Sequence, residues 1–398
     1  MNFLRQFFRR PQSLTVRRVN FQLHLWAGII LALYLIVIGV TGSVLVLRAE
    51  LETLSGLKPW HEIKAAEPFA AIATVTGNLR AAYPNMRIIS VMAPAGNDST
   101  FVAILQGRRR IRVACHPVTG EVLGVFPTAG AWLDVVQRLH ETLLIRRVGR
   151  MVNGVGAAFL LLLSLTGLVV WWPGVRTWKR ALMVDPRRHW RRINFDLHRA
   201  AGFWTVLIVS FWATSGIYFG WPGQIFQLVN WISPVTTARP PAVTVRPETS
   251  VADLDLDALI YRALAIDPGT KWRGMAFPYN RRAPLEIFMQ RRGGAGRDYQ
   301  DTVYFDPYTG RHLATWRYGV NQSLGDWLIW SQVPLHFGTA WGLGVKLIWA
   351  AAGLVIPLLT VTGLLMYWNR ALRRRWKHLR MRRLGEPVAV TVLPVFLG

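Results

Sequence analysis

The sequence has almost no cysteine. Cys115 is the single one among 398 residues, so the chain cannot form an intramolecular disulfide. It also lacks the Cys-x-x-Cys-His motif for covalent haem attachment and any cysteine cluster for an iron–sulfur or zinc site. A redox cofactor, if the protein holds one, must therefore be bound by other side chains.

Acidic residues are also scarce, with 21 Asp and Glu against 47 Lys and Arg. The sequence contains no Gly-x-Gly-x-x-Gly fingerprint, no P-loop and no Ser/His/Asp signature. We therefore expect no nicotinamide or flavin site in the chain itself.

Charged residues are absent from four hydrophobic stretches. Each is longer than the roughly 20 apolar residues that cross a hydrocarbon core. The stretches are Leu25–Leu47, Met151–Val175, Ala200–Trp221 and Leu347–Asn369. Together with 52% hydrophobic residues and 19 Trp, they predict an α-helical integral membrane protein with four transmembrane helices rather than a large soluble one. Pro357 is expected to kink the fourth helix without ending it.

Basic residues gather in three segments. Residues 1–24, 173–199 and 369–398 hold 21 of the 47 Lys and Arg but only three acids. By the positive-inside rule these segments are predicted to be cytoplasmic, together with both termini. The excess positive charge then reflects topology and contact with membrane lipid, and it does not require a nucleic-acid partner.

An internal repeat organises the chain. Asn20-Phe21-Gln22-Leu23-His24 recurs as Asn194-Phe195-Asp196-Leu197-His198, and the same offset of 174 relates Gly28 to Gly202 and Gly42 to Gly216. At an offset of 196, Leu139-His140 matches Leu335-His336, and Thr166-Gly167-Leu168 matches Thr362-Gly363-Leu364. The repeat predicts a tandem duplication in which each half is a helix, an outer domain and a helix.

The two outer segments share a turn motif. His116-Pro117-Val118-Thr119-Gly120 aligns with Asp306-Pro307-Tyr308-Thr309-Gly310, and each motif follows an alternating apolar run. Such a pattern predicts a β-hairpin. Helices are expected over Phe69–Tyr83 and Val251–Ala265, and strands over Met86–Met92 and Leu285–Gln290. Each outer segment is thus predicted to be a small α+β domain.

These patterns divide the chain into nine segments. We expect a cytoplasmic N-terminus (1–24), helix 1 (25–47), outer domain 1 with a pre-helix (48–150), helix 2 (151–172), a cytoplasmic basic loop (173–199), helix 3 (200–221), outer domain 2 with a pre-helix (222–346), helix 4 (347–369) and a cytoplasmic basic tail (370–398).

Four histidines lie at symmetry-related helix ends, where an imidazole is costly unless it is solvated, paired or coordinated. His24 and His198 are expected near the cytoplasmic face, and His140 and His336 near the outer face. The 18 residues from His24 to Gly42 alone span about 27 Å of helix, which excludes pairing His24 with His140 on one iron. The histidines are therefore predicted to pair across the repeat and to hold two haem b groups. The alternative is that they are hydrogen-bonded or reach the membrane interface.

In this combination of motifs the chain resembles the PepSY-associated transmembrane family, which includes iron-regulated membrane proteins and haem-containing siderophore reductases. The resemblance implies two periplasmic PepSY modules above a four-helix haem-binding core in the bacterial inner membrane. It also implies that a ferric siderophore or other iron chelate is reduced with electrons from a cytoplasmic donor or the quinone pool.

Two other functions stay open at this stage. One is a haem-free membrane sensor or protease-modulating module, in which the PepSY domains bind a partner and the helices only anchor them. The other is a small-solute transporter, which the duplication suggests. The four stretches, however, contain no Asp, Glu, Lys or Arg of the kind that ion coupling commonly uses.

Overall fold

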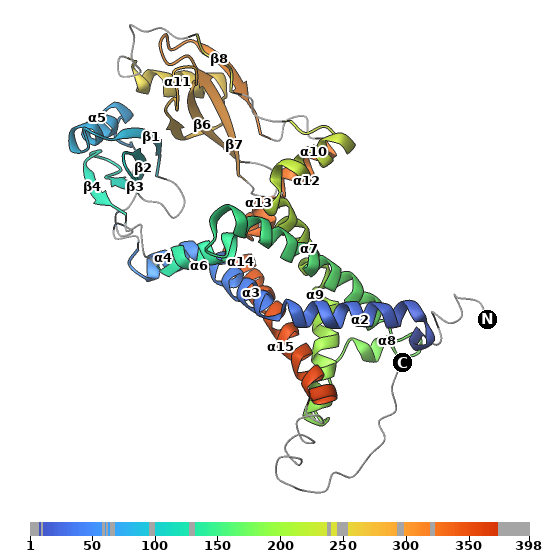
Figure 1. Ribbon diagram of the computed structural model, residues 1–398. Helices are drawn as coiled ribbons and strands as arrows, with labels where there is room; N and C mark the ends of the chain where they lie inside the picture. Colours follow the sequence, from blue (N-terminus) through green and yellow to red (C-terminus); the bar gives the residue numbers. More distant parts are fainter. Residues whose placement is uncertain are drawn as a thin grey trace.

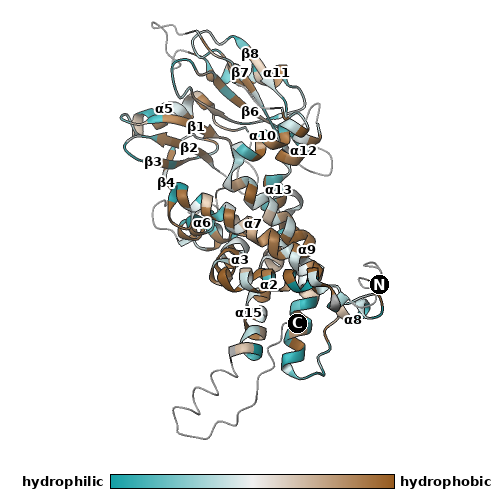
Figure 2. Cartoon of the chain, turned by 45° about the vertical axis from the view of Figure 1, so that its right-hand side comes forward, coloured by the Kyte–Doolittle hydropathy of each residue, from teal (hydrophilic) through white to brown (hydrophobic). Residues whose placement is uncertain are grey.

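The structure, a computed structural model, has a sheet part at one end and a helical part at the other (Figure 1). It describes residues 8, 11–57, 60, 63, 68–94, 100–126, 132–236, 240–244, 254–292, 298–318 and 323–372. The long helices of the helical part are mostly apolar, as the brown colour in Figure 2 shows. The predicted basic tail lies almost entirely outside the described residues.

Three helices of the helical part are long and apolar enough to cross a membrane. They are α7 (Arg146–Trp171), α9 (Trp190–Gly220) and the continuous 30-residue segment Gly342–Ala371, which begins with α14 (Gly342–Gly353) and α15 (Val355–Tyr367). Pro357 lies in the first turn of α15, where its missing N–H is least costly. The helix therefore continues past this proline, as predicted.

The first hydrophobic stretch is not one straight helix. It forms α2 (Thr15–Ile30) and α3 (Ala32–Val46), which are bent by 69° at Leu31. The described residues thus contain three unbroken candidate spans, and a fourth if this bent pair crosses as one. The two segments pack against different neighbours, α2 on α7 and α3 on α14 and α15, and this packing stabilises the bend. Gly28, a poor helix former, lies one turn before the break.

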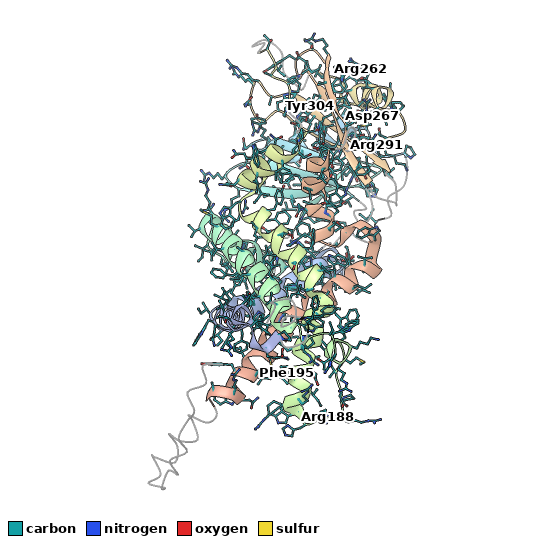
Figure 3. The ribbon with its side chains drawn as sticks, turned by 90° about the vertical axis from the view of Figure 1, so that its right-hand side faces the viewer. Arg188, Phe195, Arg262, Asp267, Arg291 and Tyr304 are labelled. Carbon is teal, nitrogen blue, oxygen red and sulfur yellow. The ribbon has the colours of Figure 1, made fainter. Side chains whose placement is uncertain are left out.

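Short helices join the spans to the sheet part. Their bounds are α4 (Arg48–Leu54), α6 (Trp132–Thr142), α10 (Pro222–Ile232), α12 (Leu324–Trp330) and α13 (Gln332–His336). At the opposite end, α8 (Trp178–Ala181) lies in the loop between α7 and α9. In Figure 3 Arg188 of that loop lies far from Asp267, Arg291 and Tyr304 of the sheet part.

The sheet part is one antiparallel sheet of eight strands in the order β4-β3-β2-β1-β5-β6-β7-β8. The strands are β1 (Arg87–Met92), β2 (Phe101–Gln106), β3 (Arg110–Cys115), β4 (Val122–Val125), β5 (Lys271–Ala276), β6 (Leu285–Arg292), β7 (Asp298–Phe305) and β8 (His312–Trp316). Helices α5 (Ile72–Ala82) and α11 (Leu256–Ile266) bury their apolar sides against one face, together with Phe101, Ile287 and Phe305. The predicted outer helices, strands and hairpins are confirmed.

The two outer units were expected to be separate domains, but the structure joins them. Strand β1 of the first unit pairs with β5 of the second through Ser90–Ala276, Val91–Met275 and Met92–Gly274. A single core of buried residues draws on both units. The backbone N–H of Ile72 in α5 also donates to the Asp257 carboxylate of α11 at 2.8 Å. The outer part of the protein is therefore one folding unit built from two distant segments.

The shared turn motif makes the same contacts in both halves. The Asp306 carboxylate accepts hydrogen bonds from the backbone N–H groups of Tyr308 and Thr309 at 2.9 and 3.2 Å. In the first half the His116 imidazole accepts from Val118 and Thr119 at 3.3 and 3.2 Å. His116 therefore replaces the aspartate as the turn acceptor, which gives it a structural role.

Gly274 is expected to be essential for the joint between the two halves of the sheet. Its φ is +156°, and an added Cβ would lie 2.6 Å from the Val91 carbonyl oxygen. We expect Gly274→Ala to lower the local free energy of opening of β1 and β5 by about 1–3 kcal/mol, because the strands must separate to admit the methyl group. Hydrogen exchange of the full chain in detergent should then rise about tenfold in both strands.

The matched control is Gly77→Ala on the exposed side of α5, where an added Cβ meets nothing within 4 Å. Exchange there should stay the same or slow down, since alanine favours a helix. Equal exchange of wild type and Gly274→Ala in β1 and β5 would show that the joint tolerates a side chain.

Candidate functional site

The structure brings His24 of α2 and His198 of α9 together between the helices. Their ring centres are 6.3 Å apart and their planes are nearly perpendicular, at 86°. The two residues hold equivalent positions in the repeat and both are partly buried. They form what we call the inner pair.

The inner pair is contacted in the same way in both halves. His24 Nδ1 is 3.2 Å from Thr166 Oγ1 of α7, and His198 Nδ1 is 3.0 Å from Thr362 Oγ1 of α15. The glycine after each threonine faces the same ring. An added Cβ on Gly167 would lie 3.1 Å from His24 Cε1, and one on Gly363 would lie 3.3 Å from His198 Cε1. Each inner imidazole thus packs against one copy of the repeated Thr-Gly motif.

His140 and His336, which we call the outer pair, lie on short helices rather than on the spans. His140 is near the end of α6, and its Nδ1 is 3.0 Å from Thr41 Oγ1 of α3. His336 ends α13, and its Nδ1 is 2.6 Å from Ser215 Oγ of α9. Phe219 packs edge-on against the His336 ring, with ring centres 5.0 Å apart.

Burial keeps the outer imidazoles neutral. It lowers the pKa of His140 to about 4 and is the main cause that lowers the pKa of His336 to about 3. A protonated His140 would lower the pKa of His336 further. A neutral imidazole is the form that ligates transition metals.

The two pairs lie far apart. Helix α9 carries His198 of the inner pair and Ser215, which contacts His336 of the outer pair. The 17 residues between them correspond to about 26 Å of helix. His24 and His140 therefore do not meet, and the four residues predicted from sequence are arranged as two sites, one toward each end of the helical part.

A buried carboxylate lies beside the inner pair. Asp196, two residues before His198, is only 3% exposed. Its two oxygens accept hydrogen bonds from Arg192 at 2.8 Å and Arg199 at 2.9 Å. Both arginines also lie over the ring of Phe195, which Figure 3 labels at this end of the molecule. Asp196 is thus held in an ion-pair network of α9 itself.

The sequence indicated the histidines but not the hydroxyls that contact them. Each of these hydroxyl residues comes directly before a glycine that belongs to the repeat: they are Thr41, Thr166, Ser215 and Thr362. Their position before a repeated glycine is the feature of the sequence that could have identified them. Within the described part of the chain, His, Cys, Asp and Glu form no group of three or more that could hold a metal ion.

Comparison with known proteins places these features in a family. A relative from Pseudomonas aeruginosa, described as an uncharacterized protein, is 28% identical over 266 residues, which cover 60% of this chain and 64% of the relative. The chain thus spans less than two thirds of that relative's length. The sequence model of the PepSY-associated TM region matches residues 21–370, from just before His24 to the end of the last span. The chain belongs to the PepSY-associated transmembrane family.

Proposed function

We propose that this membrane protein carries electrons across the bilayer through two haem b groups and reduces a ferric chelate, such as a ferric siderophore, on the periplasmic side. The observation that carries the proposal is the inner pair of imidazoles. Family resemblance supplies the chelate substrate, and the histidine geometry supplies the haem argument. The electron donor is a cytoplasmic protein or the quinone pool.

The spacing of the inner pair fits two axial ligands of one iron. A metal–nitrogen bond is about 2 Å, and a ring centre lies about 1.1 Å from each ring atom, so two imidazoles across one iron have centres about 6 Å apart. The rings of His24 and His198 are 6.3 Å apart. In addition, both rings make their hydrogen bonds through Nδ1, and among the described residues Nε2 of neither ring has a hydrogen-bond partner.

Haem iron cycles between ferric and ferrous states and so passes on one electron at a time. His24 and His198 would hold one such haem and His140 and His336 the other, and a haem held by two imidazoles would supply electron transfer rather than substrate binding at the iron. His198 and Ser215, which belong to or contact the two pairs, lie about 26 Å apart along α9. Leu35, Leu163, Val209 and Ile356 form the buried cluster in this interval.

Aromatic side chains surround the outer pair. Phe219 contacts His336, and Trp349 donates from its indole N–H to the Leu335 carbonyl at 2.7 Å. Trp212 packs edge-on against Trp349 with ring centres 6.3 Å apart. These contacts fix the short helix that carries His336. An electron delivered to a ferric chelate on this side would weaken its hard-oxygen ligation, because ferrous iron is softer and carries less charge.

The first prediction of this proposal is the orientation. The basic residues at the end remote from the sheet predict a cytoplasmic loop around Arg187 and a periplasmic sheet. A cysteine at the exposed Arg281 position should react with a membrane-impermeant maleimide in intact cells. A cysteine at Arg187 should react only after permeabilisation. Wild type, in which Cys115 is fully buried, is the unlabelled control. The reverse labelling pattern contradicts the orientation.

The second prediction is the stoichiometry and pairing of the haems. Wild type should hold two six-coordinate, low-spin haems per chain. His24→Ala and His198→Ala should each lose the same haem, and His140→Ala and His336→Ala should each lose the other. The double variant within a pair should resemble its singles, because losing either axial ligand already breaks the site. Pyridine haemochrome content and reduced spectra measure both properties.

The control for this series is His189→Ala. The His189 imidazole caps the start of α9 by accepting from the Arg191 N–H at 3.3 Å, and it contacts neither pair. This variant should keep both haems. If His24→Ala lost the same haem as His140→Ala, pairing across the repeat would be wrong. A wild-type protein without haem after haem-supplemented expression would refute the electron-transfer function.

A further inference from the structure

We propose that Thr41, Thr166, Ser215 and Thr362 are positioning residues that fix the tautomer of the four histidines. Each hydroxyl oxygen accepts a hydrogen bond from the Nδ1–H of one imidazole and so leaves the lone pair of Nε2 available for a metal. The statement about the tautomer stands on the protein alone. Its consequence for haem binding rests on the function proposed above.

The first argument is a count of hydroxyl protons. A threonine hydroxyl has one proton to donate. Three of them donate it to the carbonyl four residues earlier in their own helix, at distances of 2.6 to 2.7 Å. These bonds join Thr41 to Val37, Thr166 to Leu162 and Thr362 to Leu358. Each oxygen can then only accept from the facing Nδ1, so the nitrogen must carry the proton.

A backbone carbonyl gives a second argument for His24. His24 Nδ1 is also 3.1 Å from the Leu163 carbonyl oxygen, which lies three residues before Thr166. A carbonyl oxygen never donates. The Nδ1 of His24 is therefore the donor.

Ser215 reaches the same result with a different local bond. Its hydroxyl donates to the Trp212 carbonyl at 3.0 Å, three residues earlier, and its oxygen lies 2.6 Å from His336 Nδ1. The single proton is again used within the helix. The His336 imidazole is therefore the donor here as well, on the strength of the first argument alone.

The following glycine lets the ring come close enough for this bond. An alanine at Gly42 would place its Cβ 3.0 Å from His140 Cε1, and one at Gly167 would be 3.1 Å from His24 Cε1. Few real Cβ contacts are so short. At Thr41, Thr166 and Thr362 the hydroxyl thus supplies a hydrogen-bond acceptor and the following glycine leaves space for the ring. This is the kind of outer partner that orients metal-ligating histidines.

The experiment compares three variants of the full chain in detergent. Thr166→Val has a similar shape but no hydroxyl, Thr166→Ser keeps the hydroxyl, and Ser164→Ala removes a hydroxyl of the same helix that bonds only its own Leu160 carbonyl. Transfer of haem to apomyoglobin and the midpoint potential of the inner haem are measured. We expect the Thr166→Val variant to lose its inner haem 10- to 100-fold faster than wild type, and the midpoint potential of that haem to shift. Thr166→Ser and Ser164→Ala should stay close to wild type, and the outer haem, which reports correct folding, should be unaffected in all three.

A haem-free measurement separates this inference from the proposed function. Nitrogen-15 spectra of selectively labelled histidine distinguish protonated from unprotonated ring nitrogens in the apo chain. Wild type should show His24 protonated at Nδ1 only, and Thr166→Val should show a mixture of tautomers. If His24 in wild type is protonated at Nε2, or if Thr166→Val matches wild type in tautomer and haem retention, the inference is wrong. If the tautomer is as expected but the chain binds no haem, only the proposed function fails.

Discussion

Close contact between helices at small residues is the constraint on which the rest of the structure depends. Helices α7 and α9 approach so closely that a Cβ on Gly220 would lie 2.6 Å from the Gly154 backbone, and one on Gly216 would lie 2.9 Å from Ala157 Cβ. In a bilayer, helices gain little from burying apolar side chains, so association depends on such close packing. Because α7 carries Thr166 and α9 carries both His198 and Ser215, this one contact fixes parts of both histidine sites.

The two halves of the sequence repeat meet at both ends of the molecule. In the sheet part the halves meet at β1 and β5, and in the helical part they meet where His24 faces His198. Neither the sheet nor the inner pair is complete within one half of the chain. One half alone would leave a strand edge of the sheet unpaired and would supply only one imidazole to the inner pair. The chain therefore folds as one unit although its sequence reads as two.

The sequence predicted the local features well because each depends on nearby residues. The turns at Gly120 and Gly310 and the strands beside them follow from short-range patterns, and the structure confirms them. The bend at Leu31 was missed, since it depends on α2 and α3 packing against different helices. The joint between β1 and β5 was also missed, because it pairs Val91 with a residue 184 positions away and no local pattern encodes such a contact.

For the candidate site, repetition in the sequence predicted that His24 lies beside His198, but it did not identify the hydroxyl groups that contact the histidines. A threonine in an apolar helix commonly donates to its own backbone and needs no other explanation. The structure adds that the same oxygen lies beside a ring nitrogen, as Thr41 does for His140 and Thr362 does for His198. Only the spatial arrangement distinguishes these hydroxyls from Ser164, which makes the backbone bond alone.

The two pairs differ in what holds their ligands in place. His24 and His198 belong to long helices that pack within the helical part, whereas His336 is on a helix that continues from α12 through Ser331. Trp330 of α12 packs against Tyr318, with ring centres 4.5 Å apart, just after the last strand of the sheet. The Tyr318 N–H donates to the buried Asp301 of β7 at 2.7 Å. A continuous line of contacts thus runs from the sheet to the outer pair and has no counterpart described for the inner pair. The position of His336 therefore depends on the packing of its helix segment against the sheet part.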